Sequence, residues 1–366
     1  MKEIEVSRKK IGEIDAEMAK LFEARMEVCR DIAAYKKEHG LSVRDTTREA
    51  ELITKNCALI KDAEIESYYN QFIKNTIKLS CDYQSKLMNG LRVTYCGVEG
   101  AYAHIAAKRM FPEAELVSFP DFVSAYEAVQ SGEFDCVVLP LENSYAGEVG
   151  TVMDLLFSGD LYINQVMDLP IVHNLMGTND ATLDSIKTVV SHPQALQQCG
   201  SYIHDHGFNT HAHTNTAMAA QLVKEAGDSS LAAIASDDTA SIFNLKILDR
   251  GINDSKNNVT RFAALSRSQN RPLSKGKRED ENFILVFTVQ NEAGALAQTL
   301  NIIGAHGFNM RNLRSRPMKD LQWNYYFYIE AEGNINNQNG QDMLHELSAI
   351  CAKLRLVGTF YVHNLE

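Results

Sequence analysis

The sequence predicts a multidomain protein with an all-α domain, an α/β domain and a small α+β domain, over residues 1–90, 91–266 and 282–366. A length of 366 residues is itself typical of two or three domains. The first domain carries apolar residues at helical spacing, and the second alternates short strands with helices. A charged stretch at 267–281, read as an exposed linker, precedes a final segment with the order β-α-β-β-α-β.

Composition excludes several classes of protein. The formal net charge of −11 argues against nucleic-acid binding, and an anionic substrate needs local cations to overcome it. No apolar run reaches 18 residues, and the first residues hold no apolar signal core, so neither a membrane span nor export is expected. Seven scattered cysteines without a Cys-x-x-Cys pair indicate reduced thiols in a cytoplasm. Four clustered histidines lack fitting partners other than Asp205, so no metal site is predicted; they are His204, His206, His211 and His213.

Three helices are predicted in the first domain, at about 5–39, after the cap candidates Thr46 and Thr47 as far as Ile60, and at 63–88. At 1.5 Å per residue the first helix is roughly 50 Å long. Two shorter helices cannot cover such a length, so we expect dimerisation through the long helix.

Cations interrupt the apolar stripe of this long helix. Arg25 and Lys36 fall on it at helical spacing, together with Ile14, Met18, Leu21, Cys29 and Ile32. The third helix likewise embeds Ser80 and Gln84 among apolar residues. One interpretation is a set of buried ion pairs with Glu49. The other is a dry pocket for a small dianion, which Arg8 of a partner subunit reaches from a different helix face.

This pattern resembles the all-helical chorismate mutase family over nearly the whole module, most densely at Val43-Arg44-Asp45-x-x-Arg48-Glu49. The matching positions are Arg8, Arg25, Lys36, Asp45, Arg48, Glu49, Ser80 and Gln84. The resemblance implies rearrangement of chorismate to prephenate, a pericyclic shift that requires a folded substrate and donors at the breaking ether oxygen. By the resemblance, Arg25 and the partner's Arg8 bind the carboxylates. Lys36 and Gln84 face the ether oxygen, and the ring hydroxyl contacts Asp45, Arg48 and Glu49.

Alternating strands and helices in the second domain predict a parallel sheet, with ligands at the carboxyl ends of the strands. The predicted strands are 92–96, 115–119, 136–139, 188–190 and 231–235, and the helices are 101–110, 122–130, 195–204 and 217–224. Polar groups follow three strands, at Gly97-Val98-Glu99-Gly100, Glu142-Asn143-Ser144 and Ser191-His192-Pro193. The first stretch is a weak anion-binding signal, and Ser191 is expected to cap the next helix.

The second and third of these stretches, with Thr260-Arg261-Phe262, resemble the prephenate dehydratase family, whose fold is two α/β lobes like a periplasmic binding protein. The resemblance implies loss of carbon dioxide and hydroxide from prephenate, giving phenylpyruvate without a metal or cofactor. It makes Thr260 the proton donor and Arg261 the carboxylate partner. The implied cleft contacts are Asn143, Ser144 and Thr216, oriented by Glu142. The chain departs from the family at Ala101 and Ala103, which leaves Tyr102 or the backbone to donate there.

The last domain is predicted to be a ferredoxin-like sandwich, with strands at 283–289, 309–316, 323–330 and 357–363 and helices at 296–306 and 343–354. It resembles the ACT regulatory domain of dehydratases. The resemblance implies a phenylalanine site at Gly294, Ala295, Leu296, Asn309, Ser315 and Arg316. Ala297 and Arg314 depart from that family. The alternative is a purely structural dimerisation domain.

These features together predict a bifunctional enzyme of phenylalanine biosynthesis that phenylalanine inhibits, acting as a homodimer or higher homo-oligomer. Two alternatives stay open at this stage. The second site could act on arogenate, or the chain could be a non-catalytic amino-acid sensor. A sensor gives no reason for Arg25 and Lys36 to lie on an apolar stripe.

Overall fold

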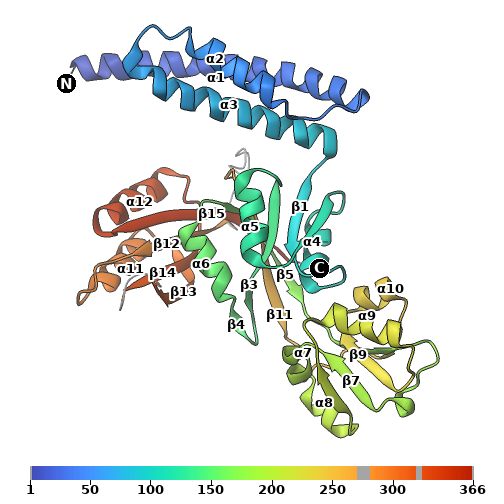
Figure 1. The fold of residues 1–366 in the computed structure, drawn as a ribbon. Helices are drawn as coiled ribbons and strands as arrows, with labels where there is room; N and C mark the ends of the chain where they lie inside the picture. Colours follow the sequence, from blue (N-terminus) through green and yellow to red (C-terminus); the bar gives the residue numbers. More distant parts are fainter. Residues whose placement is uncertain (1, 270–280, 319–323, 365–366) are drawn as a thin grey trace. The chain divides into compact units, whose positions relative to one another are not determined.

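The computed structural model describes residues 2–269, 281–318 and 324–364. Most of the predicted linker at 267–281 and the first residue of the strand predicted at 323–330 lie outside the described residues. Contacts divide the chain into two compact units, Met1–Arg92 and Val93–Glu366, and each is described by itself (Figure 1). No helix in the described ranges is both long and apolar enough to cross a membrane.

The first unit consists of three helices, α1 (Lys2–Glu38), α2 (Thr46–Cys57) and α3 (Ala63–Asn89). The N-cap of α2 is Asp45, whose carboxylate accepts the amide of Arg48 at 3.0 Å, so the expectation of a threonine cap is wrong. A carboxylate at this position satisfies an orphan amide and complements the helix dipole.

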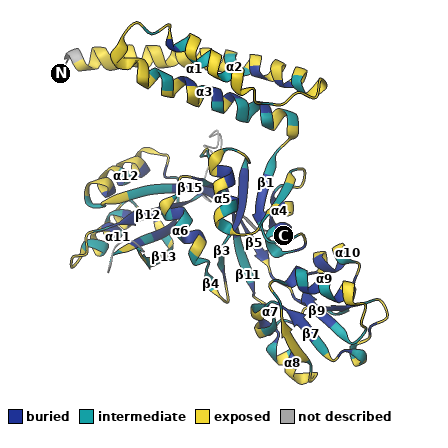
Figure 2. Ribbon diagram, viewed as in Figure 1, coloured by how far each residue is buried: buried dark blue, intermediate teal, exposed yellow. Residues whose placement is uncertain are grey.

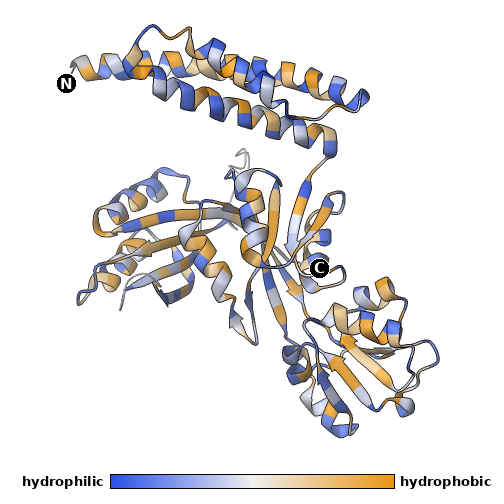
Figure 3. Cartoon of the chain, in the orientation of Figure 1, coloured by the Kyte–Doolittle hydropathy of each residue, from blue (hydrophilic) through white to orange (hydrophobic). Residues whose placement is uncertain are grey.

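Much of the apolar stripe on α1 is not covered within one chain. The helix packs along α3, and Cys29 and Ala33 in its C-terminal half are buried. Ile14, Met18 and Leu21 stay 59%, 43% and 69% exposed. Most of α1 is coloured as exposed in Figure 2, and Figure 3 shows hydrophobic segments along the same helix. Besides Cys29 and Ala33, the described part of the three-helix unit has a small buried cluster at Cys57, Ile73 and Ile77.

The second unit is built on a ten-stranded sheet and a five-stranded sheet. In chain order, the first five strands of the second unit belong to the larger sheet, and β11 (Val259–Ser266) joins this sheet after the chain has formed the smaller one. Those five are β1 (Arg92–Cys96), β2 (Glu115–Phe119), β3 (Cys136–Asn143), β4 (Gly147–Glu148) and β5 (Tyr162–Pro170). Its first helices are α4 (Tyr102–Met110), α5 (Phe122–Ser131) and α6 (Gly150–Ser158). β1 and β3 are parallel, but β11 runs antiparallel to both β3 and β5. The expectation of a purely parallel sheet is therefore wrong, because β11 re-enters this sheet from the other lobe.

The smaller sheet has the strand order β10-β6-β9-β7-β8. Its strands are β6 (Asn174–Gly177), β7 (Thr188–Ser191), β8 (Asn209–Ala212), β9 (Leu231–Ala235) and β10 (Lys246–Asp249). Its helices are α7 (Pro193–Gln198), α8 (Gly200–Asp205), α9 (Thr216–Ala226) and α10 (Asp237–Phe243), with a short 3-10 turn at Leu183–Ser185. The single helix predicted at 195–204 is two short helices that meet at Cys199. The chain passes between the sheets at 171–173 and again at 250–258, which creates two lobes (Figure 1).

The last part of the second unit has the element order β-α-β-β-α-β. The elements are β12 (Glu281–Thr288), α11 (Ala295–Ala305), β13 (Asn309–Pro317), β14 (Tyr325–Glu332), α12 (Gln338–Ile350) and β15 (Lys353–Asn364). β15 pairs parallel with β5, so these four strands extend the larger sheet. Residues of β12, β14 and β15 also share one hydrophobic core with α5 and α6. Shared burial of this kind holds the two parts together as one unit.

Candidate active sites

In the helical unit, α1 and α3 bring the predicted cation and hydroxyl together. Arg25 of α1 is half-buried and donates to the hydroxyl of Ser80 on α3 and, at 3.4 Å, to the carbonyl of Thr76. Ser80 is 3% exposed. A guanidinium held this way has further N–H donors for an anion.

A second group gathers around Cys81 of α3. Its thiol contacts the Glu49 carboxylate at 3.7 Å, and Glu49 also lies 3.8 Å from Arg44. Lys36 donates to the carbonyl of Val43 at 2.5 Å, instead of forming the alternative ion pair with Glu49. Burial raises the pKa of the Cys81 thiol, and the Glu49 charge raises it further. The Cys81 thiol is therefore uncharged where it contacts Glu49.

Gln84 completes the set on α3, one turn beyond Ser80. It is 6% exposed, and its Oε1 has no hydrogen-bond partner within the described residues. A buried amide oxygen without a partner is costly, so a donor on a ligand is expected there. The other predicted residues of this unit are exposed in the single chain; they are Arg8, Asp45 and Arg48.

In the second unit a cavity of about 310 Å³ lies between the two lobes. Its lining combines apolar side chains with uncharged polar ones and two histidines. The lining residues are Ala101, Tyr102, Phe122, Asn143, Ile171, His173, His192, Gln194, Ala195, Gln198, Asn215, Thr216 and Thr260. Three helices, α4, α7 and α9, begin at this cavity. Helix N-termini carry partial positive charge, so the site favours an anion without an arginine in the lining.

Thr260 and Asn143 are direct neighbours in the pairing of β11 with β3. The Asn143 side chain accepts the amides of Tyr145 and Ala146 at 3.0 and 2.9 Å, which fixes the orientation of its amide group. Its Nδ2 then donates to Thr260 Oγ1 at 2.9 Å. Because the threonine oxygen accepts this bond, the hydroxyl proton remains available for a molecule in the cavity.

A chain of side-chain amides extends from this pair through the buried floor. Asn143 Nδ2 also donates to Asn258 Oδ1 at 2.8 Å, and Asn258 donates to Gln198 Oε1 at 3.0 Å. Gln198 Oε1 lies 2.8 Å from His173 Nε2, while Gln198 Nε2 is buried without a partner in the described structure. Burial lowers the pKa of His173, so its ring is neutral at pH 7. Gln198 thus offers a free donor to a ligand.

Sequence reasoning assigned no role to three members of this hydrogen-bonded network, Gln198, His173 and Asn258. Two of them gave a usable signal. Gln198 lies one turn after Gln194 on the helix that follows Ser191, and Asn258 directly precedes Val259-Thr260. His173 lies in a crossing between the lobes, where no local pattern marks it.

The structure places Arg261 away from the cavity, so the expectation that it binds a substrate carboxylate is not met by the geometry. Successive residues of a strand point to opposite faces, and Thr260 occupies the cavity face. Arg261 forms two hydrogen bonds to Asp168, at 2.8 and 3.1 Å, and two to Glu330, at 3.1 and 3.0 Å. Hydrogen bonding to Asp168 raises the pKa of Arg261.

Two predicted serines also take structural positions. Ser144 bonds to the backbone of residues 257 and 259 and is absent from the described lining of the cavity, so it ties β3 to the start of β11. Ser191 donates to the carbonyl of Ile234 at 2.7 Å, and the cap of α7 is His192. The predicted capping role of Ser191 is therefore wrong. Thr216 is found in the cavity lining at the start of α9.

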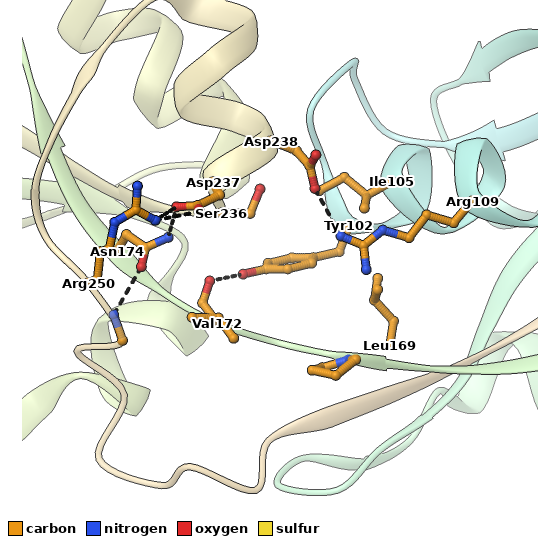
Figure 4. Close-up of a pocket in the computed structure, with 12 residues that line it drawn as sticks. Tyr102, Ile105, Arg109, Leu169, Val172, Asn174, Ser236, Asp237, Asp238 and Arg250 are labelled. Carbon is orange, nitrogen blue, oxygen red and sulfur yellow. Dashed lines mark hydrogen bonds and ion pairs between the residues drawn. The ribbon is translucent and has the colours of Figure 1, made fainter. Parts of the chain in front are cut away.

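Tyr102 also lines a second cavity, of about 440 Å³ (Figure 4). The Tyr102 hydroxyl donates to the carbonyl of Val172 at 2.9 Å, and its ring lines both cavities. Arg109 of α4 meets Asp238 of α10 at 3.3 Å and so links the two lobes. These charges are half-exposed and paired.

In the C-terminal part, the predicted effector residues lie at the start of α11 and along β13. Gly294 is the N-cap of α11 with φ +88°, a left-handed conformation that favours glycine. Ser315 is exposed, whereas Arg316 bonds to Glu148 of β4 at 2.6 Å and to Asp154 of α6 at 3.3 Å.

Comparison with known families matches two separate parts of the chain. Residues 93–270 match the family described as prephenate dehydratase, and residues 7–85 match chorismate mutase type II. The bifunctional chorismate mutase/prephenate dehydratase of Buchnera aphidicola is 29% identical over 97% of this chain and 95% of its own length. The arogenate dehydratase/prephenate dehydratase 1 of Arabidopsis thaliana is 33% identical over 74% of this chain and 72% of its own length.

Solved structures cover the second unit. The prephenate dehydratase of Arthrobacter aurescens in complex with L-Phe superimposes with a TM-score of 0.68, at 26% identity, over 74% of this chain and 90% of its own. A protein described as a quorum quenching acylase, GqqA, also reaches a TM-score of 0.68, at 28% identity, over 74% of this chain and 98% of its own.

Proposed function

The chain belongs to the prephenate dehydratase family, and from this premise we propose which of its residues perform its chemistry. It is a bifunctional enzyme of phenylalanine biosynthesis. Its chorismate mutase converts chorismate to prephenate, and its prephenate dehydratase converts prephenate to phenylpyruvate. The residue roles below are our proposal.

At the dehydratase site Thr260 is the proton donor to the departing hydroxyl. The bond from prephenate's ring carbon to its carboxylate breaks, its electron pair enters the ring, and the opposite carbon–oxygen bond breaks. Carbon dioxide and water leave, with the water carrying the donated proton, and water returns a proton to Thr260. The observation that carries this role is the 2.9 Å bond from Asn143, which occupies the hydroxyl oxygen and directs its proton to the cavity.

The substrate carboxylates are held by neutral donors. Arg261 has no part in this, since Asp168 and Glu330 occupy it. The supporting observations are the three helix N-termini at the cavity and the unpartnered Gln198 Nε2. Thr216 adds a hydroxyl at the start of α9, within the same lining. Donors that are already fixed in place need little reorganisation when charge develops.

At the mutase site Arg25 binds a carboxylate, with Ser80 holding the guanidinium. Lys36 and Gln84 act at the ether oxygen, and Glu49 acts at the ring hydroxyl. Asp45 and Arg48 remain proposed binding residues. Arg8 is proposed to act in a neighbouring subunit, and this requires at least a homodimer. The exposed apolar stripe of α1, at Ile14, Met18 and Leu21, supports that assembly.

The C-terminal part is proposed to be an ACT-type sensor that inhibits the dehydratase when phenylalanine binds. Its β-α-β-β-α-β order and the L-Phe complex of the Arthrobacter protein support this role. The proposed effector residues are Gly294, Ala295, Leu296, Asn309, Ser315 and Arg316.

All seven cysteines are free of disulfides, which supports work in a reducing cytoplasm.

The deciding experiment measures phenylpyruvate formed from purified prephenate, with and without phenylalanine, and chorismate consumption by ultraviolet absorbance. We expect both reactions, with phenylalanine suppressing only phenylpyruvate formation. Turnover of arogenate with none of prephenate would reassign the substrate. Formation of phenylpyruvate that ignores phenylalanine would reduce the C-terminal part to a structural role.

A further inference from the structure

Two charge pairs join the C-terminal part to the strands that carry Thr260 and Asn143. On β3, Glu142 accepts from Arg314 of β13 and, at 3.3 Å, from Asn312 of the same strand. On β11, Arg261 is paired with Glu330 of β14 at 3.0 Å. Both pairs are at most 29% exposed, and Glu330 is only 4% exposed. Partly buried pairs are screened less by solvent than surface pairs.

The register places these pairs directly behind the active-site residues. Thr260 is opposite Asn143 across β11 and β3, and Arg261 is opposite Glu142 in the same ladder. Neighbouring residues of a strand face opposite sides. Thr260 and Asn143 therefore line the cavity, while Arg261 and Glu142 on the other side form ion pairs with the C-terminal part. A shift of either charge pair therefore moves the backbone of a catalytic neighbour.

Strand β13 is arranged to make such contacts. Its side chains alternate, so Arg311, Leu313 and Ser315 are exposed while Asn312 and Arg314 face the dehydratase lobe. Leu313 and Ser315 belong to the free face of this edge strand. Ser315, a proposed effector residue, and Arg314 of the charge pair are thus neighbours in sequence that face opposite sides of one strand.

We propose that the Glu142–Arg314 and Arg261–Glu330 pairs position the Asn143–Thr260 hydrogen bond, and that they transmit the effector state of the C-terminal part to it. This rests on the proposed roles of Thr260 and of the sensor. Arg314, which departs from the regulatory family's pattern, is in this chain a link between the two parts. Arg261, which is absent from the described lining of the cavity, acts through its neighbour Thr260.

The pair on β3 is tested by Arg314→Leu, Glu142→Gln and the double variant in the full-length chain. We expect kcat for prephenate to fall at least about tenfold in each, with KM changed less than about threefold. Substrate contacts stay intact while the donor loses its position. The double variant should lose no more than either single one. Phenylalanine should inhibit the variants at least about tenfold less effectively than the parent chain, as expected when a coupling of about 1.4 kcal/mol is removed.

Arg311→Leu is the matched control. Arg311 lies on the same strand but pairs with Glu332 inside the C-terminal part, and it is 61% exposed. It should leave kcat and inhibition unchanged. Charge reversal, Glu142→Arg with Arg314→Glu, should recover part of the lost kcat, which a purely structural defect would not do.

The proposal is overturned if Arg314→Leu keeps kcat and phenylalanine inhibition within about twofold of the parent. It is also overturned if KM rises while kcat holds. Should Arg314→Leu fail to fold by circular dichroism, Glu142→Gln decides by the same criteria. If the parent chain does not turn over prephenate, the proposed function itself is contradicted. If the parent is active and inhibited by phenylalanine, the proposed function stands and the variants test only the role of the charge pairs.

Discussion

Replacing Thr260 with valine removes a hydroxyl from the cavity and changes almost nothing else. The side chains are of similar size and both are β-branched, so the strand conformation is retained. Asn143 Nδ2 loses one acceptor but keeps Asn258 Oδ1 at 2.8 Å and the Val259 carbonyl at 3.2 Å. The expected loss of folding stability is therefore about 1 kcal/mol or less.

The catalytic effect of this change should be much larger than its effect on stability. A positioned proton donor contributes about 10²- to 10⁴-fold in rate. At about 1.4 kcal/mol per tenfold, Thr260→Val should raise the barrier by about 2.8–5.6 kcal/mol. The assay is phenylpyruvate formation from prephenate at saturating substrate, beside a thermal melt. The mutase reaction in the same sample is the internal control, and it should be unaffected.

Thr260→Ser is the matched variant, because it keeps the hydroxyl and loses only one methyl group. We expect it to retain kcat within about tenfold of the parent. A Thr260→Val enzyme with kcat within about threefold of the parent would remove Thr260 from proton transfer. A fall in kcat together with a melting temperature several degrees lower would indicate instead that the Asn143 network had collapsed.

Three further outcomes are expected. Lys36→Ala should lower chorismate turnover by about 10²-fold or more while phenylpyruvate formation is unchanged; parallel loss in a folded variant would refute separate sites. Burial lowers the pKa of His173 below its ordinary 6.5, so the unfolded chain binds the proton first and stability should fall as pH drops below about 6.5. Thermal melts between pH 7 and 5 measure this decline in stability, which should be shallower in His173→Gln. The same dependence of stability on pH in both proteins would contradict the prediction. Gly358→Ala puts a Cβ 2.0 Å from the Ile163 carbonyl oxygen and should destabilise by at least about 2 kcal/mol. Gly304→Ala in α11, which meets nothing within 4 Å, should be neutral or stabilising.

The role of Thr260 in this scheme depends on a contact that no single segment contains. Residues 143 and 260 are 117 positions apart, and they meet because β11 returns from the second lobe to pair with β3. The resemblance to a family marked both residues, but it did not say which atom donates to which. Orientation of the Asn143 amide by two backbone donors answers that question.

What the sequence by itself determined is local. The three N-terminal helices, the strands at 92–96 and 231–235 and the C-terminal β-α-β-β-α-β order follow from periodicity and turn residues, because those depend on near neighbours. The polar groups on the stripe of the long helix were likewise visible in the spacing of residues.

Only the tertiary structure decided which way the side chains of β11 face. A strand exposes alternate residues to two surroundings, and nothing in Thr260-Arg261-Phe262 says which one holds the substrate. The C-terminal part extends the same sheet beyond β5 and brings Glu330 to the far face of β11, where Arg261 finds its partners. The same long-range packing assembled Gln198, His173 and Asn258 into one buried network. A contact between distant segments depends on the whole arrangement of strands, and local sequence patterns therefore could not reveal it.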